Sequence, residues 1–145
     1  KFDYSLKKQL VNPKKVYAID TGLANAVSFK FSEDKGRLLE NLVFIELKRR
    51  GKEIYYHKQK KECDFVIKKG LEIIEAIQVC NEMGDGRWEM GDKTKNREIE
   101  GLLDALKTYN LKEGLILTED EEGEKIIENK TIKIMPIWRW LLEKN

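Results

Sequence analysis

The stretch from Lys60 to Cys80 carries the side chains with the clearest potential for chemistry. Alternation along an extended chain puts Glu62 and Asp64 on one side of one strand, and Gln78 on one side of the next. Carboxylate oxygens are the ligands that magnesium and manganese prefer. Because the sequence has one histidine and two cysteines without CxxC spacing, a zinc site is disfavoured. Any metal site in this chain is therefore expected to be built from carboxylates.

The pairing of these two strands decides which side chains face one another. A three-residue loop would place Asp64 opposite Ala76. The same register would place Glu62 opposite Gln78. A two-residue turn would instead place Asp64 opposite Glu75 and bury more charge on the apolar side. The first register is favoured, and its apolar side then carries Phe65, Ile67, Ile77 and Val79.

Apolar periodicity predicts the elements that must position these residues. Glu40 lies at the border of the apolar face of a predicted helix over residues 33–50, which starts after Ser32 and stops at Gly51. The other predicted elements are strands at 16–20, 53–58, 63–67 and 72–79, a short helical turn at 21–29, a long loop at 81–95, a helix at 96–109, a strand at 114–118, a hairpin at 125–137 that turns at 129–130, and a helix at 138–143. This order predicts an α/β fold in which helices flank a mixed sheet.

The length and charge of the chain limit the classes of protein to which it could belong. A chain of 145 residues suits one domain, with residues 1–14 expected as a linker from a missing upstream region and residues 15–145 as the folded unit. No apolar run approaches the ~20 residues needed to cross a membrane, and two cysteines without CxxC spacing favour a cytoplasmic protein with reduced thiols. The 28 basic residues almost cancel the 26 acidic ones, so local clusters decide whether nucleic acid could bind.

Two basic clusters are candidates for a rim around the acidic residues. A phosphate-binding rim and a solvated lysine-rich surface are both compatible with the pattern. His57 is expected as a surface strand residue rather than a catalytic base, and Arg97 with Glu98 as a helix cap and ion pair rather than a phosphate contact. The candidate phosphate contacts are Lys48, Arg49, Arg50, Lys58, Lys60 and Lys61.

Several stretches together resemble one known family. The segments "VYAIDTGL", "GRLLENLVFIELKRRG", "ECDFVI", "IQV", "REIEGLLDAL" and "GLILTEDEEG" resemble the C-terminal domain of archaeal-type P-loop ATPases of the AAA class, from about Pro13 to Leu142. The resemblance implies a restriction-endonuclease-like core of the PD-(D/E)xK type. No GxxxxGK[ST] motif occurs in this chain, so the ATPase domain would lie upstream in the same protein.

The resemblance also implies a site and its defects. Glu40 and Asp64 match the helix glutamate and strand aspartate, which would hold magnesium or manganese, with Glu62, or Glu75 through a bulge, as a substitute ligand. Ala76 and Gln78 stand in the acidic and lysine places, with Gln78 as a remnant catalytic residue. The expected function is a DNA-associated domain with a degenerate deoxyribonuclease site, impaired or inactive. The alternative is a non-catalytic module that docks the ATPase onto a protein partner or onto itself.

Overall fold

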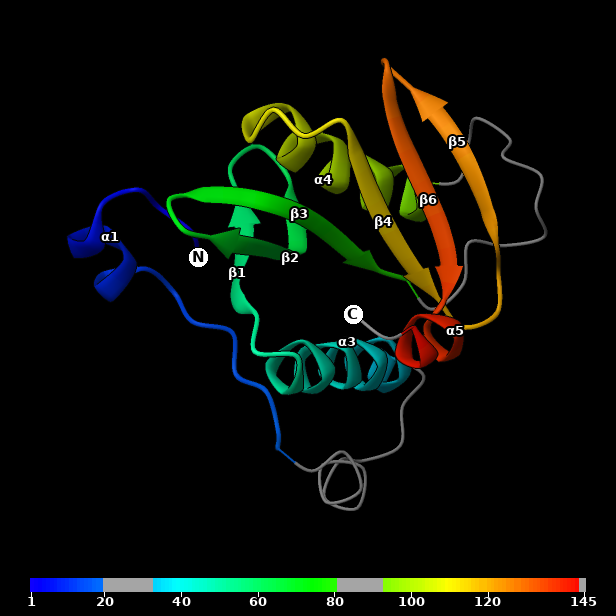
Figure 1. Ribbon diagram of the computed structural model, residues 1–145, viewed down its shortest axis with the longest axis horizontal. Coiled ribbons are helices and arrows are strands. Elements are labelled where there is room, and N and C mark those ends of the chain that lie inside the picture. The colour runs from blue at the N-terminus through cyan, green and yellow to red at the C-terminus, as the bar shows by residue number, and fades with distance from the viewer. Residues whose placement is uncertain (20–32, 81–92, 144–145) are drawn as a thin grey trace.

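The computed structural model describes residues 1–19, 33–80 and 93–143, which form an α/β fold around a mixed sheet (Figure 1). Within these residues the sheet has six strands in the order β1-β2-β3-β4-β6-β5. The strands are β1 (Glu53–Lys58), β2 (Glu62–Lys69), β3 (Glu72–Val79), β4 (Glu113–Thr118), β5 (Gly123–Ile127) and β6 (Lys130–Pro136). The helices are α1 (Leu6–Val11), α3 (Glu33–Arg49), α4 (Lys93–Thr108) and α5 (Ile137–Leu142). The predicted α/β class and mixed sheet are confirmed.

The strand directions follow from the connections. β1, β2 and β3 form an antiparallel meander, and α4 then carries the chain across the sheet so that β4 runs parallel to β3. β6 is parallel to β4, and β5 lies antiparallel to β6 at the far edge. Figure 1 shows α4 above the sheet, with α3 and α5 below it. Both faces of the sheet are therefore covered by helices.

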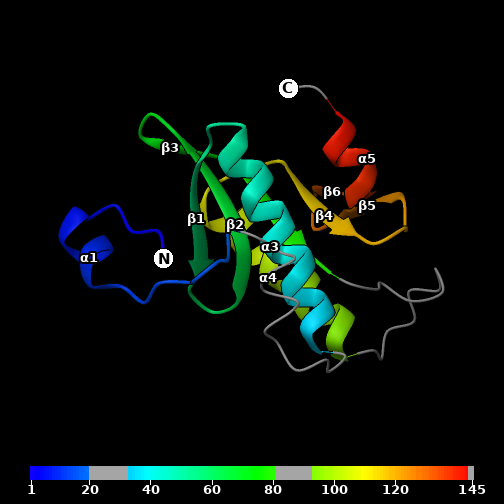
Figure 2. The same cartoon turned by 90° about the horizontal axis from the view of Figure 1, so that it is seen from below.

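The face below the sheet belongs to α3 and α5. Val43 and Leu47 of α3 are buried against the sheet, with Ile137 and Trp140 of α5 beside them. Figure 2, seen from below, shows α3 crossing the strands. The strand residues in this cluster are Phe65, Ile67, Ile77, Val79 and Leu117. The predicted packing of α3 on the Phe65 and Ile77 side of the hairpin is confirmed.

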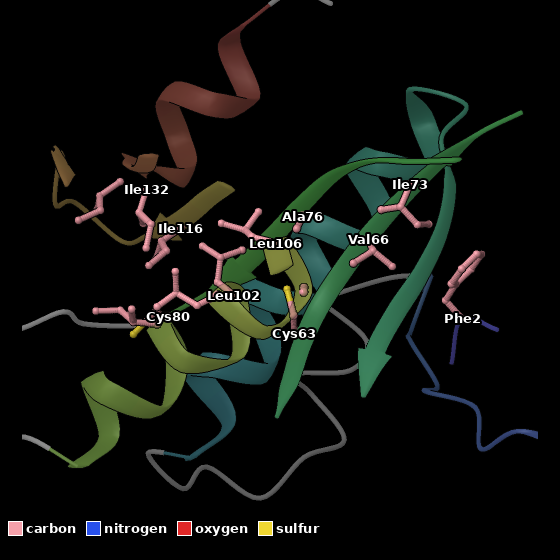
Figure 3. Close-up of a cluster of buried hydrophobic side chains, with 14 residues drawn as sticks. Phe2, Cys63, Val66, Ile73, Ala76, Cys80, Leu102, Leu106, Ile116 and Ile132 are labelled. Carbon is pink, nitrogen blue, oxygen red and sulfur yellow. The ribbon is translucent and has the colours of Figure 1, made fainter. Parts of the chain in front are cut away.

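The opposite face packs against α4. Leu102 and Leu106 meet Val66, Ala76, Ile116 and Ile132 there (Figure 3). Gly101 brings α4 unusually close to β2, because a Cβ at this position would overlap the carbonyl oxygen of Glu62. Such a close approach of helix to strand requires glycine.

The predicted register of the β2–β3 hairpin is wrong. Phe65 pairs with Ile77 and Val66 with Ala76, which brings Asp64 beside Gln78 rather than Ala76. The turn has two residues, which lie between the paired residues Lys69 and Glu72. The pairing of β2 with β3 shifts by one residue at a bulge between Ile67 and Lys68. Because the register differs by two residues, Ala76 and Gln78 keep their predicted side. The irregularities move Cys63 and Ile73 into the α4 cluster, against the prediction.

Some of the other predicted elements are present in the structure, and others are not. The second predicted helix is present as α4, and the last hairpin is present as β5 and β6 with Glu128 and Asn129 at its turn, both with positive φ. Residues 16–19 form no strand, contrary to prediction. Asp20, the predicted turn at 21–29, Ser32 and most of the loop at 81–95 lie outside the described residues. The linker role of residues 1–14 stays a prediction; these residues contain α1 and bury Phe2 in the α4-side core. In the part of the chain that is described, no helix is long and apolar enough to cross a membrane.

Candidate functional site

Three carboxylates converge around the ammonium group of Lys15. Lys15 Nζ lies 3.0 Å from Glu40 Oε1, 3.0 Å from Asp64 Oδ1 and 3.2 Å from Glu62 Oε1. Glu40 comes from α3, whereas Glu62 and Asp64 lie at the start of β2, next to the turn that follows β1. These three carboxylates, the acid cluster, are the residues that the sequence predicted to lie together. The lysine at their centre was not anticipated.

Asp64 is held rigidly by the neighbouring strand. The Gln78 amide nitrogen donates to Asp64 Oδ2 at 2.8 Å, and the Asp64 backbone N–H donates to Gln78 Oε1 at 3.1 Å. The backbone N–H of Val79 also donates to Asp64 Oδ2, at 3.1 Å. Gln78 makes a second contact, to a carboxylate oxygen of Glu98 on α4. Gln78 therefore orients Asp64 and connects the acid cluster to a fourth carboxylate, Glu98, which the sequence analysis assigned to a helix cap and an ion pair with Arg97.

Lys15 is carried by an extended segment, residues 13–18, named here the N-terminal strap. Tyr17 stacks on Phe44 of α3 with ring centroids 4.0 Å apart, and its hydroxyl donates to Glu40 Oε1 at 2.7 Å. The backbone of Ala18 exchanges two hydrogen bonds with the buried amide of Asn41, at 2.8 and 3.0 Å. Successive turns of α3 thus supply the surface on which the strap lies.

The other end of the strap is fixed to β1. The hydroxyl of Tyr56 donates to the Pro13 carbonyl at 2.9 Å, and the Lys15 ammonium lies 5.4 Å from the centre of the same Tyr56 ring. The ring face is electron-rich and attracts a cation. Lys15 is therefore held from both ends of the strap, with carboxylates on one side and an aromatic ring on another.

The charges in the cluster shift one another's protonation. Burial alone would lower the pKa of Lys15, but Asp64 and Glu40 raise that pKa above its usual value. Burial, followed by the charge of Glu40, raises the pKa of Asp64 to about 6, against the opposing effect of Lys15. Burial also favours a raised pKa at Glu62, yet Lys58 and Lys15 hold it below its usual value. The ammonium thus stays charged, and Asp64 takes up a proton at a higher pH than an ordinary aspartate does.

The arrangement does not fit the predicted magnesium or manganese ion. Over residues 1–19, 33–80 and 93–143, no three histidine, cysteine or acidic side chains are arranged to hold a metal. The centre of Glu40, Glu62 and Asp64 is filled by an ammonium at hydrogen-bonding distances, whereas magnesium needs about six oxygens near 2.1 Å. Glu75 does not substitute, because it is paired with Ile67 in the sheet and lies 3.9 Å from Lys52.

A polar hollow of about 580 Å³ opens over the acid cluster. Its lining includes Glu40, Glu62, Asp64, Gln78 and Glu98, from α3, β2, β3 and α4. Five cationic side chains also line it, namely Arg37, Lys58, Lys60, Lys61 and Arg97. Three of these, at positions 58, 60 and 61, were predicted as phosphate contacts.

The second predicted basic cluster lies elsewhere. Lys48 and Arg49 follow Glu40 by eight and nine residues on α3, or about 12 Å along the helix axis. Arg50 is only 7% exposed: it bonds Glu46 at 2.6 Å and the Trp140 carbonyl at 2.7 Å, and its guanidinium lies 4.3 Å from the Trp140 ring centre. The predicted phosphate contact by Arg50 is therefore wrong, because this side chain fastens α5 to α3.

His57 is a buried residue, contrary to the predicted surface position. It is 1% exposed, with Nδ1 3.0 Å from the Tyr109 hydroxyl and Nε2 2.9 Å from Asp104 Oδ2. Asp104 also accepts the backbone N–H of Lys61 at 3.1 Å. His57 lies on the same side of β1 as Tyr55, which packs against the α4-side cluster. The histidine therefore ties β1 to α4 and supports the turn that lines the hollow.

Comparison with known proteins adds a relative but no activity. No family model matches the chain. The chain is 40% identical over 154 aligned residues to the uncharacterized protein MJ1544 of Methanocaldococcus jannaschii. The match covers 97% of this chain and 32% of that protein, so the chain spans about a third of the length of this curated relative.

Proposed function

We propose that this chain is a DNA-associated, nuclease-like domain of the PD-(D/E)xK type whose phosphodiesterase site is impaired. The observation that carries the proposal is the polar hollow, which is lined both by the acid cluster with Glu98 and by five cationic side chains. Cations at the mouth attract the phosphate backbone, and the carboxylates beneath would be the remnant of the metal site. The upstream ATPase and the restriction-endonuclease-like fold belong to the same proposal, which draws them from the sequence resemblance.

The defects support an impaired site rather than an active one. Ala76, in the place of the second acidic residue, is buried under α4 and pairs with Val66, so no carboxylate reaches the cluster from that position. Gln78, in the lysine place, brings an amide that carries no charge. An enzyme that loses one such electrostatic contact at its reacting centre slows by about a hundredfold or more. The isolated domain is expected to cleave linear, nicked or branched DNA little or not at all in magnesium.

Salt-dependent DNA binding tests the proposal. Labelled duplex is titrated with wild type, with Lys60→Gln/Lys61→Gln, and with the control Lys7→Gln/Lys69→Gln, which removes two exposed lysines outside the hollow. Each lost phosphate contact reduces the slope of log affinity against log salt by about 0.9. The Lys60/Lys61 variant should lose about 1.8 from the slope, and the control should keep it. Equal slopes in both variants, or no wild-type binding at 50 mM salt, would refute a DNA-binding hollow.

A protein-docking role is the second candidate, and one feature favours it. β5 forms an edge of the sheet, where Ile126 is 74% exposed, and Trp138 of α5 is 58% exposed. Exposed apolar side chains at an edge strand are typical of surfaces that pair with another chain. Sedimentation of the isolated domain distinguishes the two candidates. A stable dimer that Ile126→Lys dissociates, together with absent DNA binding, would support docking.

A further inference from the structure

We propose that Lys15 is the built-in cation of the acid cluster, and that its ammonium excludes divalent metal ions from Glu40, Glu62 and Asp64. The inference concerns which cation these carboxylates hold, and it stands independently of DNA binding. The predicted metal ligands lie together, but the cation at their centre is an ammonium group. The cluster is a cation site, and its cation is covalently part of the chain.

Hydrogen-bond geometry is the first support. An ammonium has three N–H donors and no acceptor. Lys15 Nζ has three carboxylate oxygens within 3.2 Å, one from each member of the acid cluster. Two of these contacts, to Glu40 and Asp64, are hydrogen bonds, and the third, to Glu62, is an ion pair, so each carboxylate of the cluster is matched by the ammonium. Each contact is charge-assisted, which makes it stronger than a bond between neutral groups.

Competition for the same oxygens is the second support. A divalent ion bound to Glu40 Oε1 and Asp64 Oδ1 at about 2.1 Å would lie in the space of the ammonium, so only one of the two cations can be present. The remaining oxygen of Asp64 already accepts hydrogen bonds from Gln78 and from the Val79 N–H. A metal ion therefore gains a ligand set only if Lys15 leaves.

The anchoring of the strap is the third support. Tyr17 and Ala18, on one side of Lys15, are fixed to α3, and Pro13, on the other side, is fixed to Tyr56. A tethered group faces its site at an effective concentration in the millimolar range or above. A free divalent ion must therefore displace a group that the strap keeps beside the carboxylates.

Manganese binding by Lys15→Met tests the proposal, because methionine keeps most of the apolar stem and removes the charge. Lys14→Met is the matched control; its Nζ bonds the Gln9 carbonyl, away from the cluster. Free Mn²⁺ is measured by electron paramagnetic resonance during titration. Wild type and Lys14→Met should show no saturable site below 1 mM, whereas Lys15→Met should gain one site that binds at least tenfold more tightly. Adding Asp64→Asn to Lys15→Met should remove that site.

Two results would overturn the proposal. One is saturable binding by wild type with a dissociation constant equal to that of Lys15→Met, because the ammonium would then exclude nothing. The other is a folded Lys15→Met protein that binds no Mn²⁺, because the carboxylates would then form no cation site. If Lys15→Met fails to fold, Lys15→Gln replaces it, and wild type is examined by nuclear magnetic resonance. Site-specific broadening of the Gln78 side-chain amide by Mn²⁺ in wild type would refute exclusion without any variant.

Discussion

Removal of the Lys15 charge should destabilise the fold, and the loss should depend on pH. Lys15→Met leaves Glu40, Glu62 and Asp64 facing one another at a partly buried position. Removing one partner of a buried ion pair costs 3–5 kcal/mol, because a charge is left without compensation. Lys15 is 23% exposed and Glu62 is 39% exposed, so solvent screens part of this penalty. We expect the free energy of unfolding to fall by about 3 kcal/mol at pH 8.

Protonation of Asp64 sets the direction of the pH dependence. Its pKa in the folded protein is raised from 3.8 to about 6, so between these values the folded state binds more protons than the unfolded chain. Stability therefore falls as pH rises through this window. Without Lys15, which lowers the pKa of Asp64, the window extends above pH 6. At pH 5 the variant carries a neutral Asp64, and the loss relative to wild type should shrink to about 1–2 kcal/mol.

Urea unfolding followed by circular dichroism at pH 5 and pH 8 measures both effects. Lys14→Met controls for the loss of a neighbouring exposed lysine and should match wild type at both pH values. Lys15→Met/Asp64→Asn should recover part of the lost stability at pH 8, since one of the facing charges is gone. A loss below about 0.5 kcal/mol at pH 8, or the same loss at both pH values, would refute the idea that Lys15 compensates buried carboxylates.

Two further predictions concern how the site is positioned. Gly101→Ala should destabilise the domain by about 3 kcal/mol or more, because the new Cβ overlaps the Glu62 carbonyl. Gly36→Ala, at a helical position with open space around it, should stabilise the domain by about 0.5–1 kcal/mol. Equal shifts in melting temperature for the two variants would contradict the close approach of α4 to β2. Asn41→Ala removes both hydrogen bonds to the Ala18 backbone and should cost about 2 kcal/mol. The same change should speed proteolysis within residues 1–19, and an unchanged cleavage rate would argue against anchoring by Asn41.

Much of the fold could be predicted because most of its elements have a regular apolar period. Val43 and Leu47 reach the sheet from one face of α3, and alternation put Phe65 and Ile77 on the matching face of the hairpin. Irregularities broke the prediction locally. A bulge shifted the register of the β2–β3 hairpin, and nothing in the residue pattern marks where a strand accommodates an extra residue.

The candidate site was predictable only in part, for a related reason. The acid cluster follows from helix and strand positions, so Glu40, Glu62 and Asp64 were brought together correctly. Lys15 lies 25 residues from Glu40 and 49 residues from Asp64, in a segment without helix or strand. No periodicity places such a segment. The hydrogen bonds between Asn41 and the Ala18 backbone hold this segment against α3, and these bonds exist only in the folded chain.

The N-terminal strap also fixes an order of events during folding. Every surface on which it lies comes later in the sequence, namely Glu40, Asn41 and Phe44 on α3 and Tyr56 on β1. Residues 13–18 leave the ribosome before α3 and β1, yet they can dock only after the helix and the hairpin have met. Until then the acid cluster has no ammonium at its centre, and its carboxylates repel one another. The strap therefore completes the domain after the elements that follow it in the sequence, and its docking places a positive charge among the three carboxylates.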